Sequence, residues 1–315
     1  MMNAVLSNPD HPEYGVATIP FPIPHDQYAH CMELLEALEI GDAVKTDCKV
    51  EKIDSFYTVL KRAEMLTVNV EELNYLAKRL ESFDTGEAAQ FQAMAHKLEL
   101  FELKDFINLT FCCQQATVIT DFSDLAAIGR DHYMNLHGGS ASVDELNKLD
   151  GEETARRLIE NGSGTITPYG VVYDNGMKLE QVYDGRFFPC YYYEPNVITV
   201  AVTSKAEPED TEHITWLYLP MVQEEIDRAL LRGGITDPAD VRLRLEDSQL
   251  PNEVDILLDM ECETLSDLNE LAAATDGLSK ADMEKLDAVV TPAEPKSAAQ
   301  IKKLAENLNL FDFAP

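Results

Sequence analysis

The sequence predicts a multi-domain α+β protein of elongated shape, in which small α/β modules and helical bundles are duplicated around an antiparallel β meander. A repeat with a period of about 195 residues predicts the duplication. Alternating apolar residues and tight-turn dipeptides between the two copies predict the meander. The chain has 315 residues. A single hydrophobic core rarely supports a chain of this length, so more than one domain is expected. Its net charge is −32, from 57 acidic and 25 basic residues.

The repeat is clearest in one helical segment. Residues 70–77 align with residues 265–272, and Leu73 and Asn74 match Leu268 and Asn269. Two further helices are predicted after each segment, at 87–97 and 102–111 in the first copy and at 279–290 and 297–308 in the second. The apolar spacing pairs Leu73, Phe91 and Phe106 with Leu268, Leu286 and Leu304, which places three extra residues in the loop 292–295 of the second copy.

Upstream of these helices, each copy has a strand, a helix and a second strand. The first copy is predicted at 17–21, 28–38 and 49–53, and the second at 215–219, 223–231 and 241–245. Pro24 and Pro220 precede the two predicted helices, where a missing N–H costs nothing.

The meander is predicted over residues 164–204. Asn175-Gly176 and Asp184-Gly185 suit tight hairpin turns, because glycine accepts a positive φ, and strands are expected to continue at 191–193 and 197–202. Residues 207–212 are predicted to be an acidic linker. The resulting domains are an α/β module at 1–66, a helical bundle at 67–140, an α+β domain with the meander at 141–205, and the second copy at 206–315.

The negative charge is unevenly distributed along the chain. Residues 206–315 hold 25 acidic and 9 basic residues, which is half of the net charge, and residues 237–276 hold 12 acidic residues against Arg242 and Arg244. Thirty-two charges equal those on about 54 Å, or roughly 16 base pairs, of DNA duplex. Such an excess opposes compaction, so we expect it to serve solubility, a cationic partner or imitation of a polyanion. Direct nucleic-acid binding is not expected, because phosphates are repelled.

Known catalytic motifs are absent from the sequence. It contains no G-x-G-x-x-G, P-loop, G-x-S-x-G or H-E-x-x-H pattern, and its six cysteines and seven histidines have no metal-ligand spacing. We therefore expect no enzyme activity, no cofactor and no metal. With no readable signal peptide or membrane span, a cytoplasmic location is expected. An enzyme site in the meander, around Tyr169, Tyr173 and Arg186, remains as an alternative.

Two segments carry a resemblance to a known family. Residues 70–77 read VEELNYLA, and residues 119–133 contain Asp124, Gly129, Arg130 and Tyr133 in a D-x-x-x-x-G-R-x-x-Y pattern. In this order, and in so acidic a chain, they resemble the ArdA antirestriction proteins of conjugative plasmids and transposons. The resemblance is clearest over residues 15–140 and weaker over 213–313.

The resemblance implies a DNA mimic without catalysis. Members of that family are elongated, acidic and dimeric, and they occupy the DNA-binding groove of type I restriction-modification enzymes. This chain is nearly twice as long as a typical member and adds the second copy and the meander. The duplication therefore leaves both a monomer and a homodimer open, because the second module can replace part of a second subunit.

The candidate mimic surface lies in the most acidic stretch. Asp255, Asp259, Glu263 and Asp267 follow one another at i, i+4 spacing, which on a helix places carboxylates about 5–6 Å apart. The candidate partner-binding residues are Asp237, Asp240, Glu246, Asp247, Glu253, Asp255, Asp259, Glu261, Glu263, Asp267 and Glu270. The rival hypothesis is an acidic interaction protein of a mobile element that inhibits another basic partner, such as a CRISPR nuclease, a nucleoid protein or a repressor.

Overall fold

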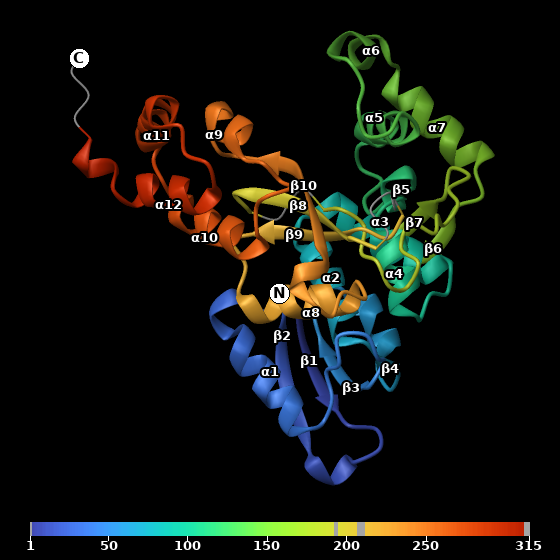
Figure 1. Ribbon diagram of the computed structural model, residues 1–315. Coiled ribbons are helices and arrows are strands. Elements are labelled where there is room, and N and C mark those ends of the chain that lie inside the picture. The colour runs from blue at the N-terminus through green and yellow to red at the C-terminus, as the bar shows by residue number, and fades with distance from the viewer. Residues whose placement is uncertain (1, 192–194, 207–211, 312–315) are drawn as a thin grey trace. The chain divides into compact units, whose positions relative to one another are not determined.

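The computed structural model describes residues 2–191, 195–206 and 212–311. The chain forms two compact units, unit 1 from Met1 to Gly185 and unit 2 from Arg186 to Pro315 (Figure 1). Helices and antiparallel sheets occur together, so the α+β prediction is confirmed. None of the described helices is long and apolar enough to cross a membrane.

Unit 1 begins with a four-stranded antiparallel sheet in the order β2-β1-β3-β4. Its strands are β1 (Met2–Ser7), β2 (Val16–Phe21), β3 (Cys48–Asp54) and β4 (Thr67–Val68), and α1 (Tyr28–Ala37) connects β2 to β3. Alternate residues of β1 are buried, as expected for a strand with one face on the core. Three helices follow: α2 (Val70–Glu81), α3 (Thr85–Lys97) and α4 (Leu103–Leu109).

The rest of unit 1 is a smaller layer. A three-stranded sheet, in the order β5-β7-β6, contains β5 (Thr117–Ile119), β6 (Thr165–Thr167) and β7 (Gly170–Tyr173). Between β5 and β6 lie α5 (Leu125–Leu136), α6 (Val143–Lys148) and α7 (Gly151–Asn161). Their shared core is small and includes Ile128, Ala155 and Leu158.

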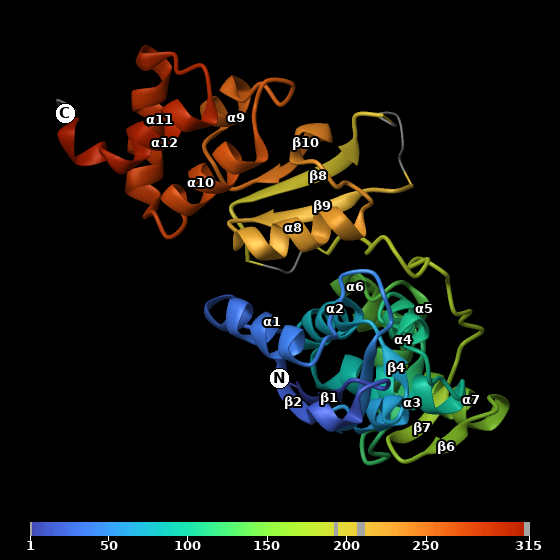
Figure 2. The ribbon, with the colours of Figure 1, turned by 60° about the horizontal axis from the view of Figure 1, so that its bottom comes forward.

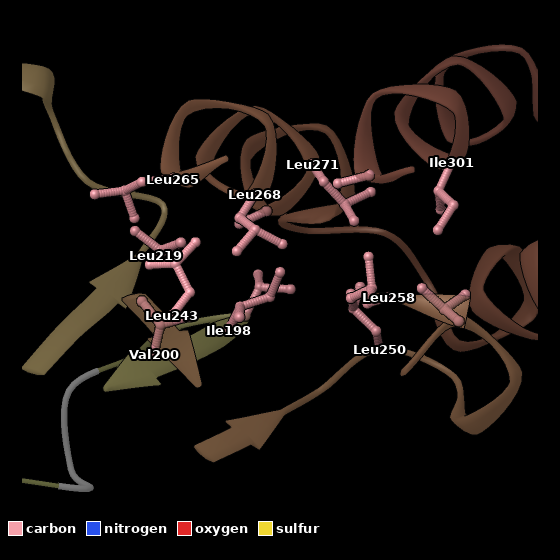
Figure 3. Packing of buried hydrophobic residues seen from close by; sticks show 14 of the residues in the cluster. Ile198, Val200, Leu219, Leu243, Leu250, Leu258, Leu265, Leu268, Leu271 and Ile301 are labelled. Carbon is pink, nitrogen blue, oxygen red and sulfur yellow. The ribbon is translucent and has the colours of Figure 1, made fainter. Parts of the chain in front are cut away.

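Unit 2 has one sheet, in the order β10-β8-β9, followed by helices (Figure 2). The elements are β8 (Ile198–Ser204), β9 (Thr215–Leu219), α8 (Gln223–Arg232), β10 (Val241–Ser248), α9 (Asn252–Leu257), α10 (Leu265–Thr275), α11 (Lys280–Ala293) and α12 (Ala298–Glu306). Leu268, Leu271 and Ile301 are fully buried, in one cluster with the side chains of the sheet and with Leu250 and Leu258, which flank α9 (Figure 3). Truncating one such leucine to alanine typically costs about 2–5 kcal/mol.

The two units repeat one architecture. In both sheets the first strand lies between the second and the third, so β2-β1-β3 corresponds to β9-β8-β10. The N-cap residues of the three following helices are separated by the same 195 positions, with Asn69 matching Thr264 and Asp84 matching Ser279. The Phe21–Pro22 and Leu219–Pro220 peptide bonds are both cis.

One hydrogen bond, buried in the first copy and partly buried in the second, is common to both copies. The side-chain oxygen of Asn74 accepts the backbone N–H of Ile23 at 2.8 Å, and that of Asn269 accepts the N–H of Met221 at 2.9 Å. Asn269 also donates to the carbonyl of Met221 at 2.9 Å. The helix of each repeat is thereby fixed to the segment that follows the second strand.

Replacing Asn74 with alanine should lower the unfolding free energy of unit 1 by about 2 kcal/mol, because the buried N–H of Ile23 loses its acceptor. Denaturant unfolding measures the change. The exposed Asn147→Ala serves as the control, with an expected change within about 0.5 kcal/mol. Equal stability of the two variants would contradict the role given to Asn74.

The predicted pairing of Phe106 with Leu304 is wrong. The third helices begin after Glu102 and Ser297, which are also 195 positions apart, so Phe106 corresponds to Ile301. Both side chains are fully buried. No extra residues therefore precede the third helix of the second copy; α12 is longer than α4 and extends past the equivalent position.

The predicted meander over 164–204 is also wrong. The turn at Asn175-Gly176 does adopt positive φ, but no strand follows it in residues 177–191. Instead Tyr183 is buried beside the helices, where its backbone N–H donates to Asn108 at 2.7 Å and its hydroxyl donates to Glu72 at 2.8 Å. The alternation of apolar and polar residues around Tyr183 is typical of a strand, but here the tyrosine is held by side chains of the helices.

Strand β8, which the sequence assigned to the meander, belongs to the sheet of unit 2. It pairs with both β9 and β10, and it corresponds to β1, a strand that the sequence patterns did not reveal. The expected strand residues 192–193 and the linker residues 207–211 lie outside the described part of the chain.

Candidate protein-interaction surface

The charge difference between the two copies is concentrated in one segment. Residues 246–263, here called the acidic connection, lead from the end of β10 through α9 to α10. They contain seven acidic residues and no lysine or arginine. The equivalent residues 51–68, 195 positions earlier, lead from the end of β3 to α2 in unit 1 and contain three acidic and three basic residues. Both copies therefore form the same fold, although only the second carries an excess of negative charge in this segment.

The two units as wholes are almost equally charged. Unit 1 contains 31 acidic and 14 basic residues, a net charge of −17, and unit 2 contains 26 and 11, a net charge of −15. The excess of negative charge in the last third of the chain thus arises largely from the acidic connection. The rest of unit 2 resembles unit 1 in charge.

Three apolar side chains anchor the acidic connection. Leu250, Val254 and Leu258 are buried in the core of unit 2, and Figure 3 shows Leu250 and Leu258 on the side that faces α10. Their spacing of four residues leaves the acidic positions between them free to face solvent. The connection is consequently a fixed part of the fold rather than a polar tail.

Most of the candidate carboxylates are solvent-exposed. Asp255, Glu263 and Asp267 are partly buried. The exposed candidates are Asp237, Asp240, Glu246, Asp247, Glu253, Asp259, Glu261 and Glu270.

Several of the exposed acids already have partners. Glu246 pairs with Arg244 at 3.3 Å, and Glu270 pairs with Lys302 of α12 at 2.8 Å. Asp237 accepts the backbone N–H of Ala239 at 2.9 Å. For Asp247 and Glu253, the described residues provide no ion pair. The described residues likewise provide no ion pair for Asp240, Asp259 and Glu261, so these five exposed carboxylates have no basic partner there.

The expected i, i+4 row of carboxylates on one helix is not formed. Asp255 lies in α9, Asp267 lies in α10, and Asp259 and Glu263 lie in the turn between them. In that turn Asp259 accepts the backbone N–H of Glu261 at 3.2 Å, and its own carbonyl accepts the N–H of Glu263 at 3.0 Å. A short aspartate-stabilised turn replaces the helix, so the spacing of the charges follows the turn.

Glu263 has a structural contact. Its two carboxylate oxygens each lie 3.0 Å from the backbone nitrogen of Ala298, the first residue of α12. Burial raises the pKa of Glu263, the N–H of Ala298 opposes this change, and Asp267 and Asp259 raise the pKa further. Glu263 therefore fixes the connection to the start of α12, where an unsatisfied N–H and the helix dipole favour a carboxylate.

Asp255 is the least favourably placed carboxylate of the set. Its Oδ1 atom is buried and has no hydrogen-bond partner in the described residues. Burial raises its pKa, a hydrogen bond from the Ser248 hydroxyl opposes this, and the charge of Asp247 raises the pKa further. Ionisation of Asp255 thus works against the folded state.

Asp255→Asn should stabilise unit 2 at pH 7 by a few degrees of melting temperature, since an amide keeps the acceptor for Ser248 and removes a partly buried charge. In the wild type the raised folded-state pKa means that stability from this group is gained as pH falls through that pKa towards the ordinary carboxyl value of 3.8. The Asp255→Asn variant should lack this pH-dependent gain in stability. Thermal unfolding of both proteins between pH 4.5 and 7.5 checks the prediction, and a lower melting temperature of the variant at pH 7 would contradict it.

The motif residues of the 119–133 segment have structural positions. Asp124 caps α5 by accepting the N–H of Ala127 at 2.9 Å, and Tyr133 stacks on His137 with ring centroids 4.1 Å apart. Gly129 is buried where α5 meets Gly151 of α7. Arg130 is exposed.

The alternative enzyme site is not assembled within either unit. Tyr169 and Tyr173 belong to unit 1, whereas Arg186 belongs to unit 2. The Tyr169 hydroxyl lies 2.9 Å from that of Thr58, and Tyr173 is buried. Among the described residues, no group of three or more histidine, cysteine or acidic side chains is arranged to hold a metal ion.

The sequence patterns did not reveal the charge difference between residues 246–263 and 51–68. It appears only when the copies are aligned from their capped helices, because the sequences of the two connecting segments share no pattern. Comparison of the sequence with models of known families and with curated proteins finds no match.

Proposed function

We propose that the protein is a non-catalytic DNA mimic, an antirestriction protein that occupies the DNA-binding groove of type I restriction-modification enzymes. The observation that carries the proposal is the acidic connection, which has seven acidic and no basic residues where the other copy of the fold has three of each. Because unit 1 builds the equivalent segment without excess charge, this architecture does not require the excess of carboxylates.

The physical basis is electrostatic competition. A DNA-binding groove carries lysine and arginine side chains placed for phosphates, and an acidic surface enters the same field and is attracted over long distances. Binding releases counterions, so the affinity should fall steeply with salt, as it does for DNA. Asp247, Glu253, Asp259 and Glu261 are the exposed carboxylates of the connection without a basic partner in the described residues.

Transformation of an unmodified plasmid into a host with a type I system tests the proposal in cells. Expression of the protein should raise the transformation frequency towards that of the restriction-deficient host, and leave the frequency in the deficient host unchanged. Unchanged restriction in hosts of several type I families would reject the proposal. Affinity capture would then be expected to recover a different basic nucleic-acid-binding protein.

A further inference from the structure

A cluster of four polar side chains joins three separate segments of unit 1. The hydroxyl of Thr117, in β5, is almost fully buried and lies 2.9 Å from Nδ1 of His132 in α5. Nδ2 of Asn135, one turn further along α5, lies 3.3 Å from the same hydroxyl. Nδ2 of Asn175, in the turn after β7, lies 2.9 Å from it. All three contacts therefore converge on one oxygen atom.

The direction of each hydrogen bond follows from the backbone around the cluster. Nδ2 of Asn135 also donates to the carbonyl of Ala116 at 3.1 Å, and Nδ2 of Asn175 donates to that of Gln115 at 2.8 Å. Both atoms contact carbonyl oxygens, so both are nitrogen atoms and both donate to Thr117. A hydroxyl oxygen has two lone pairs and one proton. With both lone pairs used, the proton of Thr117 is donated to His132 Nδ1.

We propose that His132 and Thr117 form an acid-sensitive latch, which holds α5 and the Asn175 turn on β5 only while the imidazole is neutral with its proton on Nε2. Protonation places an N–H on Nδ1, opposite an oxygen that has no acceptor capacity left. The imidazolium must then displace one of the asparagine donors or move away from Thr117. Either event loosens the contact of α5 with β5.

The surrounding charges do not compensate the imidazolium. Burial is the only cause that lowers the pKa of His132. The neighbouring segment after β7 contributes Asp174, which pairs with Lys97 at 2.6 Å, and the turn before β5 contributes the buried thiol of Cys113. On α5, burial raises the pKa of Asp131, Arg130 lowers it, and the charge of Asp124 raises it further. The charged residues of α7 form the pairs Glu152–Arg156 and Glu153–Arg157.

The sign of the pH dependence follows from the lowered pKa. An unfolded histidine has a pKa of about 6.5. As pH falls below this value, the unfolded or opened state takes up a proton that the closed state does not, so the latch loses stability until pH reaches the lower pKa of the closed state. Within this window, the opening equilibrium changes by at most about tenfold for each pH unit.

Nitrogen NMR of the full chain tests the tautomer directly. At pH 7.5 the His132 ring should show a protonated Nε2 and an unprotonated Nδ1. By contrast, His137 places Nδ1 2.7 Å from the carbonyl of Tyr133, an acceptor only, so its Nδ1 should carry the proton. A proton on Nδ1 of His132 at this pH would overturn the proposal.

Amide hydrogen exchange tests the latch itself. After correction for intrinsic rates, exchange in β5 and the later turns of α5 should rise by about fivefold or more between pH 7 and pH 5. His132→Asn keeps an acceptor at the position of Nδ1 but does not titrate, so this rise should disappear. The His137→Asn variant, at the exposed end of the same helix, should keep the pH-dependent rise in exchange. Equal pH dependence in the wild type and His132→Asn would also overturn the proposal.

Discussion

Changing Asp247, Glu253, Asp259 and Glu261 to the corresponding amides should abolish protection against restriction and weaken binding to a type I enzyme by about 30-fold or more. The estimate assigns about 0.5 kcal/mol to each exposed charge, and 2 kcal/mol corresponds to roughly a 30-fold change in Kd. The fold should persist, because all four side chains are exposed and the anchors Leu250, Val254 and Leu258 are unchanged.

The matched control removes the same amount of charge elsewhere. Asp26, Glu33, Glu36 and Glu39 are exposed in or beside α1 of unit 1, and their amide variants change the net charge by the same four units. This control should retain most of the protection. If both quadruple variants lose protection equally, the total charge and not the acidic connection is responsible, and the assigned surface is wrong.

Gly129→Val should disrupt the packing of α5 on α7 and lower the stability of this part of unit 1 by about 3 kcal/mol or more. A Cβ atom at position 129 would lie 1.9 Å from the backbone oxygen of Gly151, and one at position 151 would lie 2.4 Å from that of Ala126. Backbone atoms cannot rotate away, so the helices must separate. Overpacking typically costs about 1–3 kcal/mol even where side chains can adjust.

The separation should expose the small core around Ile128, Ala155 and Leu158. Amide hydrogen exchange in α5 and α7 and denaturant unfolding both measure the loss of this core. Arg130→Ala, at the next and exposed position, should change stability by no more than about 0.5 kcal/mol. A Gly129→Val protein with wild-type exchange in α5 and α7 would show that the close contact is absent in solution.

The elements with local signals could be predicted from the sequence. The helices of both copies follow amphipathic patterns, and the repeated asparagine relates α2 to α10 from sequence alone. Its acceptor role towards Ile23 and Met221 could not be predicted, because those residues lie about 50 positions away.

The errors have a common cause in long-range contacts. The alternation around Tyr183 predicts a strand, but contacts of this tyrosine with Asn108 and Glu72, far earlier in the chain, hold the segment instead. Similarly, the i, i+4 carboxylates suggested a helix, but Asp259 stabilises a turn and Glu263 binds the start of α12. Spacing in sequence cannot distinguish these cases from regular structure.

The duplication supplies an internal comparison for the candidate surface. Both copies use the same sheet order and the same helix starts, yet only the second carries the acidic connection. The sequence located the acidic stretch within residues 237–276. The charge difference from the other copy is limited to 246–263, and it is visible only beside the structurally equivalent residues 51–68, since no residue pattern relates the two segments.

A competition titration tests the central claim most directly. A purified type I enzyme is bound to a labelled DNA duplex, and the protein or its acidic-connection variant is added at two salt concentrations. The account predicts that the wild-type protein displaces the DNA, that displacement weakens as salt rises, and that the variant requires about 30-fold more protein. Failure of the wild-type protein to displace DNA at low salt, across several type I enzymes, would contradict the account.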